Sequence, residues 1–564
     1  MQKLLTEAGM SLPEIPWNRY PRPQMVRKDW LCLNGTWDLT YKARKTKILV
    51  PFCAESLLSG LDLAGENGEP LAYGESLEYS RSFSVPESWA GKRVLLHFGA
   101  VSRLADVLVN GTPVARHEES YLPFSADITD ALTAGENCLT VRAVNDVSCK
   151  HLWGKQKIDR GGMWYTPCSG IWQTVWLEPV PDRHISSLKI RTEENRVEIR
   201  LEGAEGGSIL FGGEVIPFAG STVRFPVKSP RFWSPEDPYL YRFSLRSGED
   251  AVESYFALRT LSIREVKGIP RLCLNGEPYF FHALLDQGYW SDGLYTPADP
   301  EGFERDILAM KALGFNTLRK HIKIEPEQFY YDCDRLGMVV FQDMVNCGKY
   351  IYFRDTVIGT ILGIFGRGDH KLNRDREART SFLSSMDETV RLLGNHPCIC
   401  LWTIFNEGWG QFCADSAYRR LKTLDPSRFI DSTSGWFRQR ESDVESLHIY
   451  FRKLYLTKRK RRPQLISEFG GWSLKIPDHS FNPEKTFGYR KYTDREAFLR
   501  DLKDLYAKQV LPLVPKGLCG AVYTEVSDVE DETNGLLTYD RREAKVKPED
   551  LEEFAVLLQE AVRA

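Results

Sequence analysis

Short runs of alternating apolar and polar residues fill the first third of the chain, up to about residue 180. The stretches 93–98, 105–112 and 139–144 have the two-residue period of half-buried strands. The second of them contains Asn110-Gly111, a dipeptide that strongly favours a two-residue hairpin turn. Short strands separated by regular turn signals predict an all-β sandwich over residues 1–180.

A second strand-rich region follows, over residues 181–265. The stretches 188–191 and 196–201 again alternate with period two. Residues 232–241 contain two prolines and predict a loop that leads into a strand. The length of the region suits an immunoglobulin-like β-sandwich.

From residue 266 to the C-terminus, short apolar strands alternate with helical patterns. The helical patterns include 300–313, 326–336, 379–393 and 495–509. Eight β/α units in about 300 residues predict a TIM barrel, in which functional groups sit at the C-terminal ends of the strands. The eight candidate strands are 280–284, 317–320, 339–343, 399–405, 429–432, 446–449, 465–467 and 520–524.

Composition and charge exclude several classes of protein. With 42% hydrophobic and 27% charged residues, the chain of 564 residues is not a wholly disordered protein. A net charge of −3 gives no electrostatic footprint for nucleic acid or an anionic membrane. The one basic run, residues 458–462, is expected to be a solvated loop before the seventh barrel strand. We therefore expect neither nucleic acid nor a membrane as a partner.

The N-terminal sequence and the cysteines indicate the cellular compartment of the protein. No apolar core of signal-peptide length follows Lys3, and no stretch approaches a membrane span. The 12 cysteines show no disulfide-scaffold spacing, and Cys398 and Cys400 alternate as packing residues of a buried strand. Together these features predict a cytoplasmic protein.

Two glutamates follow predicted barrel strands. Glu407 comes after the apolar run 399–405, and Glu468 after the shorter run 463–467. As ends of the fourth and seventh strands, they are placed to converge on one mouth of the barrel. Glycoside hydrolysis needs two such carboxyl groups. No phosphate-binding loop, nucleophile elbow or His-Glu-x-x-His helix is present, so we expect no cofactor and no metal.

The order sandwich, immunoglobulin-like domain and barrel resembles glycoside hydrolase family 2, which includes β-galactosidases, β-glucuronidases and β-mannosidases. In the first region, 107–111, 121–129 and 170–177 look like the family's sugar-binding-type domain. The run 395–407 resembles its acid/base motif almost throughout, and 465–470 falls where the family keeps its nucleophile.

The resemblance implies a role for individual residues. Glu407 would be the acid/base and Glu468 the nucleophile, with retention of anomeric configuration. Asn406 would hydrogen-bond the sugar 2-hydroxyl, and Arg319 would lie beneath the nucleophile and hold it ionised, or form a structural ion pair. The further substrate-binding candidates are His448, Tyr450, Tyr523, Asp286 and Trp409. For the first three of these, a packing role remains an alternative.

The sugar is less well defined. The lysine that grips the uronate carboxylate in β-glucuronidases of the family is missing beside Asn534. We therefore expect an exo-β-glycosidase acting on a terminal β-galactoside of an oligosaccharide or glycoside conjugate. The alternatives are a β-glucuronidase or β-galacturonidase with an atypical clamp, and a non-catalytic carbohydrate-binding protein. Candidate clamp cations are Lys320, Lys323, Lys349, Arg354 and Arg452.

Two further features concern assembly and access to the site. The chain is a possible homo-oligomer. The long stretch 346–376 follows the third barrel strand, and it is expected to form a lid or wall of the site or an oligomer contact.

Overall fold

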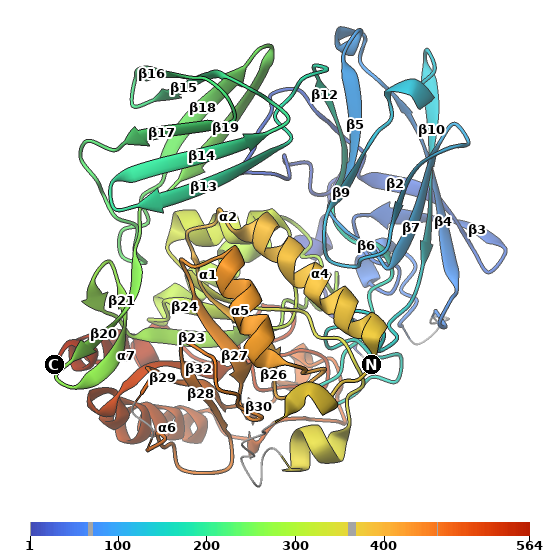
Figure 1. Cartoon of the computed structure of the whole chain (residues 1–564). Coiled ribbons are helices and arrows are strands. Elements are labelled where there is room, and N and C mark those ends of the chain that lie inside the picture. The colour runs from blue at the N-terminus through green and yellow to red at the C-terminus, as the bar shows by residue number, and fades with distance from the viewer. Residues whose placement is uncertain (1, 66–70, 359–367, 459–460) are drawn as a thin grey trace.

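The computed structural model describes residues 2–65, 71–358, 368–458 and 461–564. Two β-sandwiches lie beside each other and over one side of a β/α barrel (Figure 1). This is the multidomain architecture that the hydrophobic pattern predicts. Part of the stretch 346–376 and part of the basic run 458–462 lie outside the described residues.

The N-terminal sandwich has two main antiparallel sheets packed face to face. Apolar residues of alternating strand positions, such as Trp37, Tyr79 and Leu96, fill the space between them. Its hairpin turn at Asn110-Gly111 has φ of 51° and 79°, the left-handed conformation that a two-residue turn of this kind requires. One sheet has the order β1(Leu31–Cys32), β12(Val175–Val180), β5(Arg93–Phe98), β9(Phe124–Asp127). The other has the order β3(Arg44–Val50), β2(Gly35–Tyr41), β4(Ser76–Ser84), β10(Glu136–Val144), β7(Leu104–Val109), β8(Thr112–His117).

The second sandwich is the immunoglobulin-like domain, with Ile199, Ile209, Leu245 and Val252 in its core. Three short strands, β20(Leu261–Val266), β21(Ile269–Leu274) and β22(Glu277–Pro278), form a separate small sheet before the barrel. One sheet of the sandwich is β13(Ser187–Glu193), β14(Arg196–Glu202), β17(Thr222–Pro226), and the other is β16(Glu214–Phe218), β15(Gly207–Phe211), β18(Tyr241–Ser247), β19(Asp250–Phe256).

All eight predicted barrel strands are present and run parallel. Their hydrogen-bonded ladder leaves one seam, between β27 and β28, so the barrel is nearly closed. The order around it is β27(Phe429–Ser434), β26(Ile399–Asn406), β25(Val339–Asp343), β24(Thr317–Lys320), β23(Phe281–Asp286), β32(Leu518–Thr524), β29(Gln464–Gly470), β28(Glu445–Ile449). The predicted TIM barrel is confirmed.

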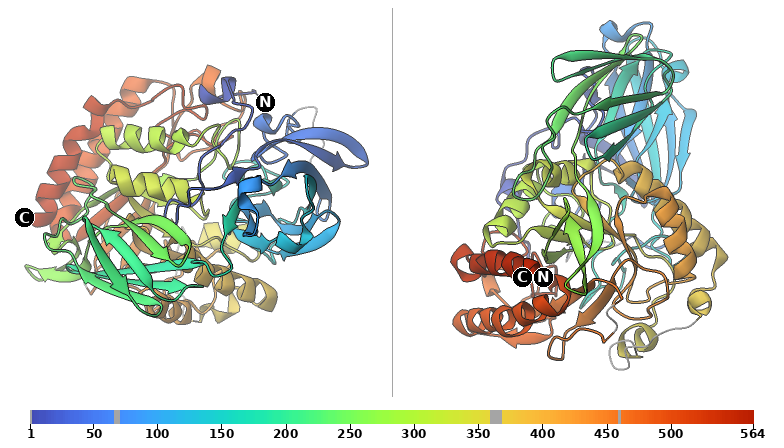
Figure 2. Two further views of the ribbon diagram at one scale, coloured as in Figure 1. Left: turned by 90° about the horizontal axis from the view of Figure 1, so that it is seen from above. Right: turned by 60° about the vertical axis from the view of Figure 1, so that its left-hand side comes forward.

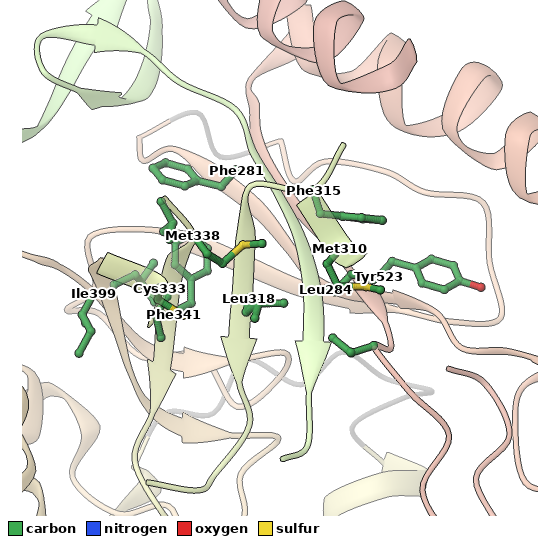
Figure 3. Close-up of a cluster of buried hydrophobic side chains, with 14 of the residues drawn as sticks. Phe281, Leu284, Met310, Phe315, Leu318, Cys333, Met338, Phe341, Ile399 and Tyr523 are labelled. Atoms are coloured by element: carbon green, nitrogen blue, oxygen red, sulfur yellow. The ribbon is translucent and has the colours of Figure 1, made fainter. Parts of the chain in front are cut away.

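Helices cover the outside of the barrel, as the views in Figure 2 show. Their apolar residues meet those of the strands, for example Met310 of α1 with Leu284 of β23 (Figure 3). Among the described residues, no helix is long and apolar enough to cross a membrane, and all twelve cysteines are free thiols. The α-helices among the described residues are α1(Glu301–Ala312), α2(Glu327–Leu336), α4(Arg376–Leu393), α5(Ala414–Leu424), α6(Arg495–Leu505) and α7(Pro548–Arg563).

A buried carboxylate ties the immunoglobulin-like domain to the barrel. Asp334 of α2 is 0% exposed; its Oδ2 accepts a hydrogen bond from the Tyr255 hydroxyl at 2.7 Å and lies 2.7 Å from His396 Nδ1. Its Oδ1 accepts from the backbone N–H of Cys398 at 2.8 Å. The same side chain therefore fixes a sandwich strand, a barrel helix and the entry to β26.

Replacing Asp334 with Ala is expected to lower the free energy of unfolding by about 3–5 kcal/mol, because it leaves buried donors without their shared acceptor. Urea denaturation would measure the loss. Asp38→Ala serves as control: Asp38 pairs with Lys47 at 2.9 Å, but its side chain is 71% exposed. The control should change stability by about 0.5 kcal/mol or less. Equal effects of the two substitutions would contradict the role of Asp334.

Candidate active site

A pocket of about 320 Å³ opens at the C-terminal ends of the barrel strands. It contains both glutamates singled out in the sequence, and residues of the N-terminal sandwich complete its wall. Its lining residues are Lys155, Met163, Leu285, Gln287, His321, Asn406, Glu407, Trp409, Tyr450, Glu468, Phe487, Tyr489, Thr524 and Glu532.

Glu407 reaches the pocket through an unusual backbone conformation. It follows the last residue of β26 and has φ of 51°, a left-handed conformation that is costly for a residue with a side chain. Its N–H donates to the carbonyl of Ser434 at 2.9 Å, which secures the turn. The next residue, Gly408, has φ of 76°, and a Cβ there would lie 2.4 Å from the Phe437 ring. The chain thus turns sharply where the carboxyl group enters the pocket.

Glu468 is positioned by an irregularity in β29. Along β28, Leu447 pairs with Ile466 but His448 pairs with Glu468, so Ser467 is an extra residue in β29. A bulge of this kind bends a strand and re-aims the side chains that follow it. It brings Glu468, which is 4% exposed, to the pocket wall beside His448.

Arg319 of β24 lies beneath these groups and is 1% exposed. Its guanidinium donates to Asp343 Oδ1 at 3.0 Å, Glu468 Oε1 at 3.0 Å and Asn406 Oδ1 at 2.8 Å. It also donates to the Ser467 carbonyl at 2.9 Å. Because Asn406 has its amide oxygen engaged in this way, its NH₂ group remains available to a ligand hydroxyl.

The two glutamates lie close together, with His448 between them. One carboxylate oxygen of each glutamate and a ring nitrogen of His448 all lie within 4.8 Å of one another. His448 Nδ1 is 2.7 Å from Glu407 Oε1 and 3.4 Å from Glu468 Oε2. The Tyr450 hydroxyl donates to the same oxygen, Glu468 Oε2. Tyr489 stacks on Tyr450, with ring centroids 3.8 Å apart.

The surroundings drive the pKa values of the two carboxyl groups apart. Burial raises the pKa of Glu407, and the charge of Glu468 adds to the rise against the opposing hydrogen bond to His448. Burial acts in the same direction on Glu468, but the charges of His448 and Arg319 outweigh it and lower the pKa of that carboxyl. One protonated and one ionised carboxyl group is the combination that acid/base and nucleophilic work require.

The set Glu407, His448 and Glu468 is also of a type that holds metal ions. The hydrogen bonds around it favour proton chemistry instead. Arg319 and Tyr450 both donate to Glu468, so a cation placed there would meet the guanidinium charge and compete with two donors. Burial lowers the pKa of the neighbouring His321 to about 4, and its Nδ1 lies 2.9 Å from Asp343.

Four predicted substrate-binding residues are not part of the pocket lining. Arg319 and His448 contact the two glutamates, whereas the other two, Asp286 and Tyr523, lie apart from them. Asp286 lies 2.6 Å from Lys320 Nζ and accepts from the Gly288 N–H at 2.9 Å, in a small separate cavity. Tyr523 is 0% exposed; its ring packs against Phe469 of the core, and in Figure 3 it lies in that core. Each of these side chains leaves its strand on the face opposite the pocket, so substrate binding by Asp286 and Tyr523 stays a prediction that the geometry of this pocket does not favour.

Trp409 does line the pocket. It is 2% exposed and packs against Trp164 of the first domain, with ring centroids 5.3 Å apart, and against Tyr350 at 5.7 Å. Tyr350 belongs to the stretch 346–376. The start of that stretch is tied to the first domain, because the Trp153 indole donates to the Gly348 carbonyl at 3.1 Å. This described part packs against Trp409, and residues 359–367 lie outside the described residues, so a lid, a wall or an oligomer contact stays a prediction.

The predicted clamp cations lie elsewhere. Lys320 and Lys323 both contact Glu325, at 2.8 and 2.9 Å, and Arg354 pairs with Asp355. None of these three lines the pocket, and neither do the exposed Lys349 and Arg452.

The cation that does line the pocket is Lys155 of the N-terminal domain. Lys155 is not among the clamp cations predicted from the sequence, all of which belong to the barrel. Lys155 stands in a stretch with no strand or helix periodicity, so no local pattern could have identified it.

Comparison with known families matches this architecture along most of the chain. Models described as "Glycosyl hydrolases family 2, sugar binding domain", "Glycosyl hydrolases family 2" and "Glycosyl hydrolases family 2, TIM barrel domain" match residues 65–181, 182–259 and 272–479. The chain belongs to glycosyl hydrolases family 2. The resemblance drawn from the sequence motifs is thereby confirmed.

Curated relatives within family 2 carry different names. A β-galactosidase of Aeromonas hydrophila subsp. hydrophila is 29% identical over 399 residues, which are 63% of this chain and 36% of that protein. A β-glucuronidase of Felis catus is 25% identical over 414 residues, 62% of this chain and 58% of that protein. The matched region thus spans well under two thirds of the length of either relative.

Solved structures of family 2 proteins share the fold. A β-D-glucuronidase of Dictyoglomus thermophilum superposes with a TM-score of 0.76 at 18% identity, covering 95% of this chain and 98% of the other. A β-galacturonidase of Eisenbergiella tayi gives a TM-score of 0.69 at 18% identity, with coverage of 95% and 99%. At this identity the likeness establishes the three-domain fold alone.

Proposed function

We propose that the protein is a retaining exo-β-glycosidase that removes a terminal β-linked sugar by double displacement. The observation that carries this proposal is the pair Glu407 and Glu468, with carboxylate oxygens within 4.8 Å and pKa values shifted in opposite directions. Retaining enzymes hold their carboxyl groups about 5–5.5 Å apart, whereas inverting enzymes need about 6.5–9.5 Å for a water molecule.

In the first step, protonated Glu407 gives its proton to the glycosidic oxygen while the Glu468 carboxylate attacks the anomeric carbon. The bond from that carbon to the leaving oxygen breaks, and a glycosyl ester forms on Glu468. Arg319 keeps Glu468 ionised for the attack, and the Asn406 amide is placed to donate to the sugar 2-hydroxyl.

In the second step, Glu407, now a carboxylate, takes a proton from water, and the resulting oxygen nucleophile attacks the anomeric carbon. The ester bond to Glu468 breaks, which restores both carboxyl groups to their starting states. Two inversions at the same carbon give net retention. Tyr450 donates to Glu468 and so stabilises the carboxylate as it leaves.

Two classes of substrate are candidates for this pocket. The sequence favours a β-galactoside, in keeping with the name of the Aeromonas relative. A β-uronide is the second candidate, supported by the lysine in the pocket wall. A third alternative is a non-catalytic sugar-binding protein. It is the weakest, because such a protein has no need for two carboxyl groups whose pKa values are shifted in opposite directions.

Glu468→Gln is expected to abolish turnover nearly completely, because the amide cannot form the glycosyl ester. Glu407→Gln should lower kcat/KM by about 10²–10⁴-fold for alkyl glycosides, whose leaving group needs the proton, and much less for nitrophenyl glycosides. Steady-state rates with both kinds of aglycone would measure the difference. Equal losses for both would contradict the assignment of Glu407 as the acid.

The stereochemistry gives an independent check on the same pair. Proton NMR of a β-glycoside digest should show the β-anomer of the free sugar first, followed by mutarotation. An α-anomer as first product would overturn the double displacement whatever the mutants do.

The electrostatics predict a bell-shaped pH profile of kcat/KM. Its acidic limb reports ionisation of Glu468 and its alkaline limb deprotonation of Glu407. Arg319 lowers the pKa of Glu468, so Arg319→Gln should move the acidic limb to higher pH. Arg319→Lys retains a cation and should move it less.

Tyr450→Phe tests the assignment of the acidic limb to Glu468 without disturbing the ion pair between Arg319 and Asp343. It removes one hydrogen bond to the ionised carboxylate, so the acidic limb should again move to higher pH while the chain folds normally. An acidic limb that stays in place in both Arg319→Gln and Tyr450→Phe would show that it does not report Glu468.

A further inference from the structure

Lys155 is a largely buried residue whose ammonium has aromatic neighbours but no anionic partner among the described residues. Its residue is 7% exposed, yet within residues 2–65, 71–358, 368–458 and 461–564 its Nζ has neither a hydrogen-bond acceptor nor a carboxylate at ion-pair distance. An unpaired buried charge is costly, and proteins normally pair such groups or use them to bind a ligand. Lys155 lies in the wall of the pocket that holds Glu407 and Glu468.

The backbone around Lys155 is held firmly. Gly154 has φ of 64°, and a Cβ there would lie 2.8 Å from the Tyr121 hydroxyl. The Lys155 carbonyl accepts from the Tyr165 N–H at 2.9 Å. Its ammonium lies 5.4 Å from the ring centroid of Tyr165 and 6.0 Å from that of Trp409. The lysine is therefore positioned before any ligand arrives.

The carboxylates of the pocket are engaged by other donors. Glu468 accepts from Arg319 and Tyr450, and Glu532 accepts from the Tyr165 hydroxyl and from the Asn534 amide. The charge of Lys155 does reach Glu407, whose pKa it acts to lower. In the part of the chain that the structure describes, no carboxylate lies within 4.0 Å of the ammonium, although its charge also acts on Glu525.

Other lysines near the mouth show the contrast. Lys320 and Lys323 are as deeply buried, at 0% and 1% exposure, but each lies within 2.9 Å of Glu325. These two buried lysines are thus paired with a carboxylate, whereas Lys155 is not.

We propose that Lys155 is the specificity-determining cation of the pocket and binds the carboxylate of a terminal β-linked hexuronic acid. The inference rests on the proposed function, because it takes the pocket as the site of the sugar. The sugar carboxylate would supply the negative charge that Lys155 lacks inside the protein. Burying that carboxylate in the pocket would be costly without a cation within salt-bridge reach. The clamp would come from the N-terminal domain and not from the barrel.

The test compares nitrophenyl β-galacturonide, β-glucuronide and β-galactoside as substrates of the wild type and Lys155→Met. The wild type should turn over one of the uronides best. Lys155→Met should lose about 100-fold or more in kcat/KM for that uronide, since a buried charge pair loses one partner. Its rate with the galactoside should fall much less, so that the ratio of uronide to galactoside kcat/KM falls.

Lys157→Met is the matched control. Lys157 comes from the same stretch, but its ammonium lies 3.8 Å from the ring centroid of Trp164 and outside the pocket. It should leave the ratio of uronide to galactoside turnover unchanged. A loss of uronide turnover equal to that of Lys155→Met would overturn the proposal.

Stability and binding provide readouts that do not depend on turnover. Lys155→Met should melt at the same temperature as the wild type or higher, because it removes an unpaired buried charge. Free galacturonic or glucuronic acid should raise the melting temperature of the wild type and not that of Lys155→Met. A marked drop in the melting temperature of the variant would assign the lysine a structural role and overturn the proposal.

The possible failures are distinguishable. If the wild type prefers the galactoside, or if Lys155→Met lowers all three rates equally, the uronate proposal is wrong while the retaining glycosidase stands. If no β-glycoside is hydrolysed by the wild type and Glu468→Gln changes nothing, the proposed function itself fails.

Discussion

The guanidinium of Arg319 is the centre on which the site depends. It is almost fully buried, and its donors reach Asp343, Glu468, Asn406 and the Ser467 carbonyl. These partners lie on or at the ends of three other strands of the barrel, so one planar group fixes their mutual distances. The arrangement is stable only while the carboxylates balance the cation. The charge that holds the strand ends together is therefore the same charge that keeps Glu468 ionised.

The barrel could be predicted because its strands are continuous apolar runs buried on both faces. For β24 and β25 the predicted and observed bounds are the same. The helix α4 begins three residues before the predicted start, because the Asp375 side chain caps the N–H groups of Glu377 and Ala378. The placement of Glu407 and Glu468 at one mouth of the barrel could also be predicted from the order of the strands. The bulge at Ser467 could not be predicted, since it arises from pairing with neighbouring strands.

Asp286 and Tyr523, which the sequence predicts as substrate-binding residues, lie off the pocket for a common physical reason. Side chains alternate between the two faces of a strand, so a shift of one position moves a residue from the pocket to the opposite face. Leu285 and Gln287 line the pocket, and Asp286 between them does not; Thr524 lines it, and Tyr523 before it does not. A motif match identifies the strand end correctly without fixing which of two neighbouring residues faces the substrate.

The remaining wall comes from an irregular stretch of the N-terminal domain, which no barrel motif describes. Arg160 reaches Glu530 of the barrel at 3.2 Å, and the Thr166 N–H donates to the same side chain at 2.9 Å. These contacts hold the stretch that carries Lys155 against the mouth. The barrel motifs, which define the carboxyl pair, are therefore informative about the reaction. The charge that Lys155 brings to the pocket depends instead on the packing between two domains, which the barrel motifs do not describe.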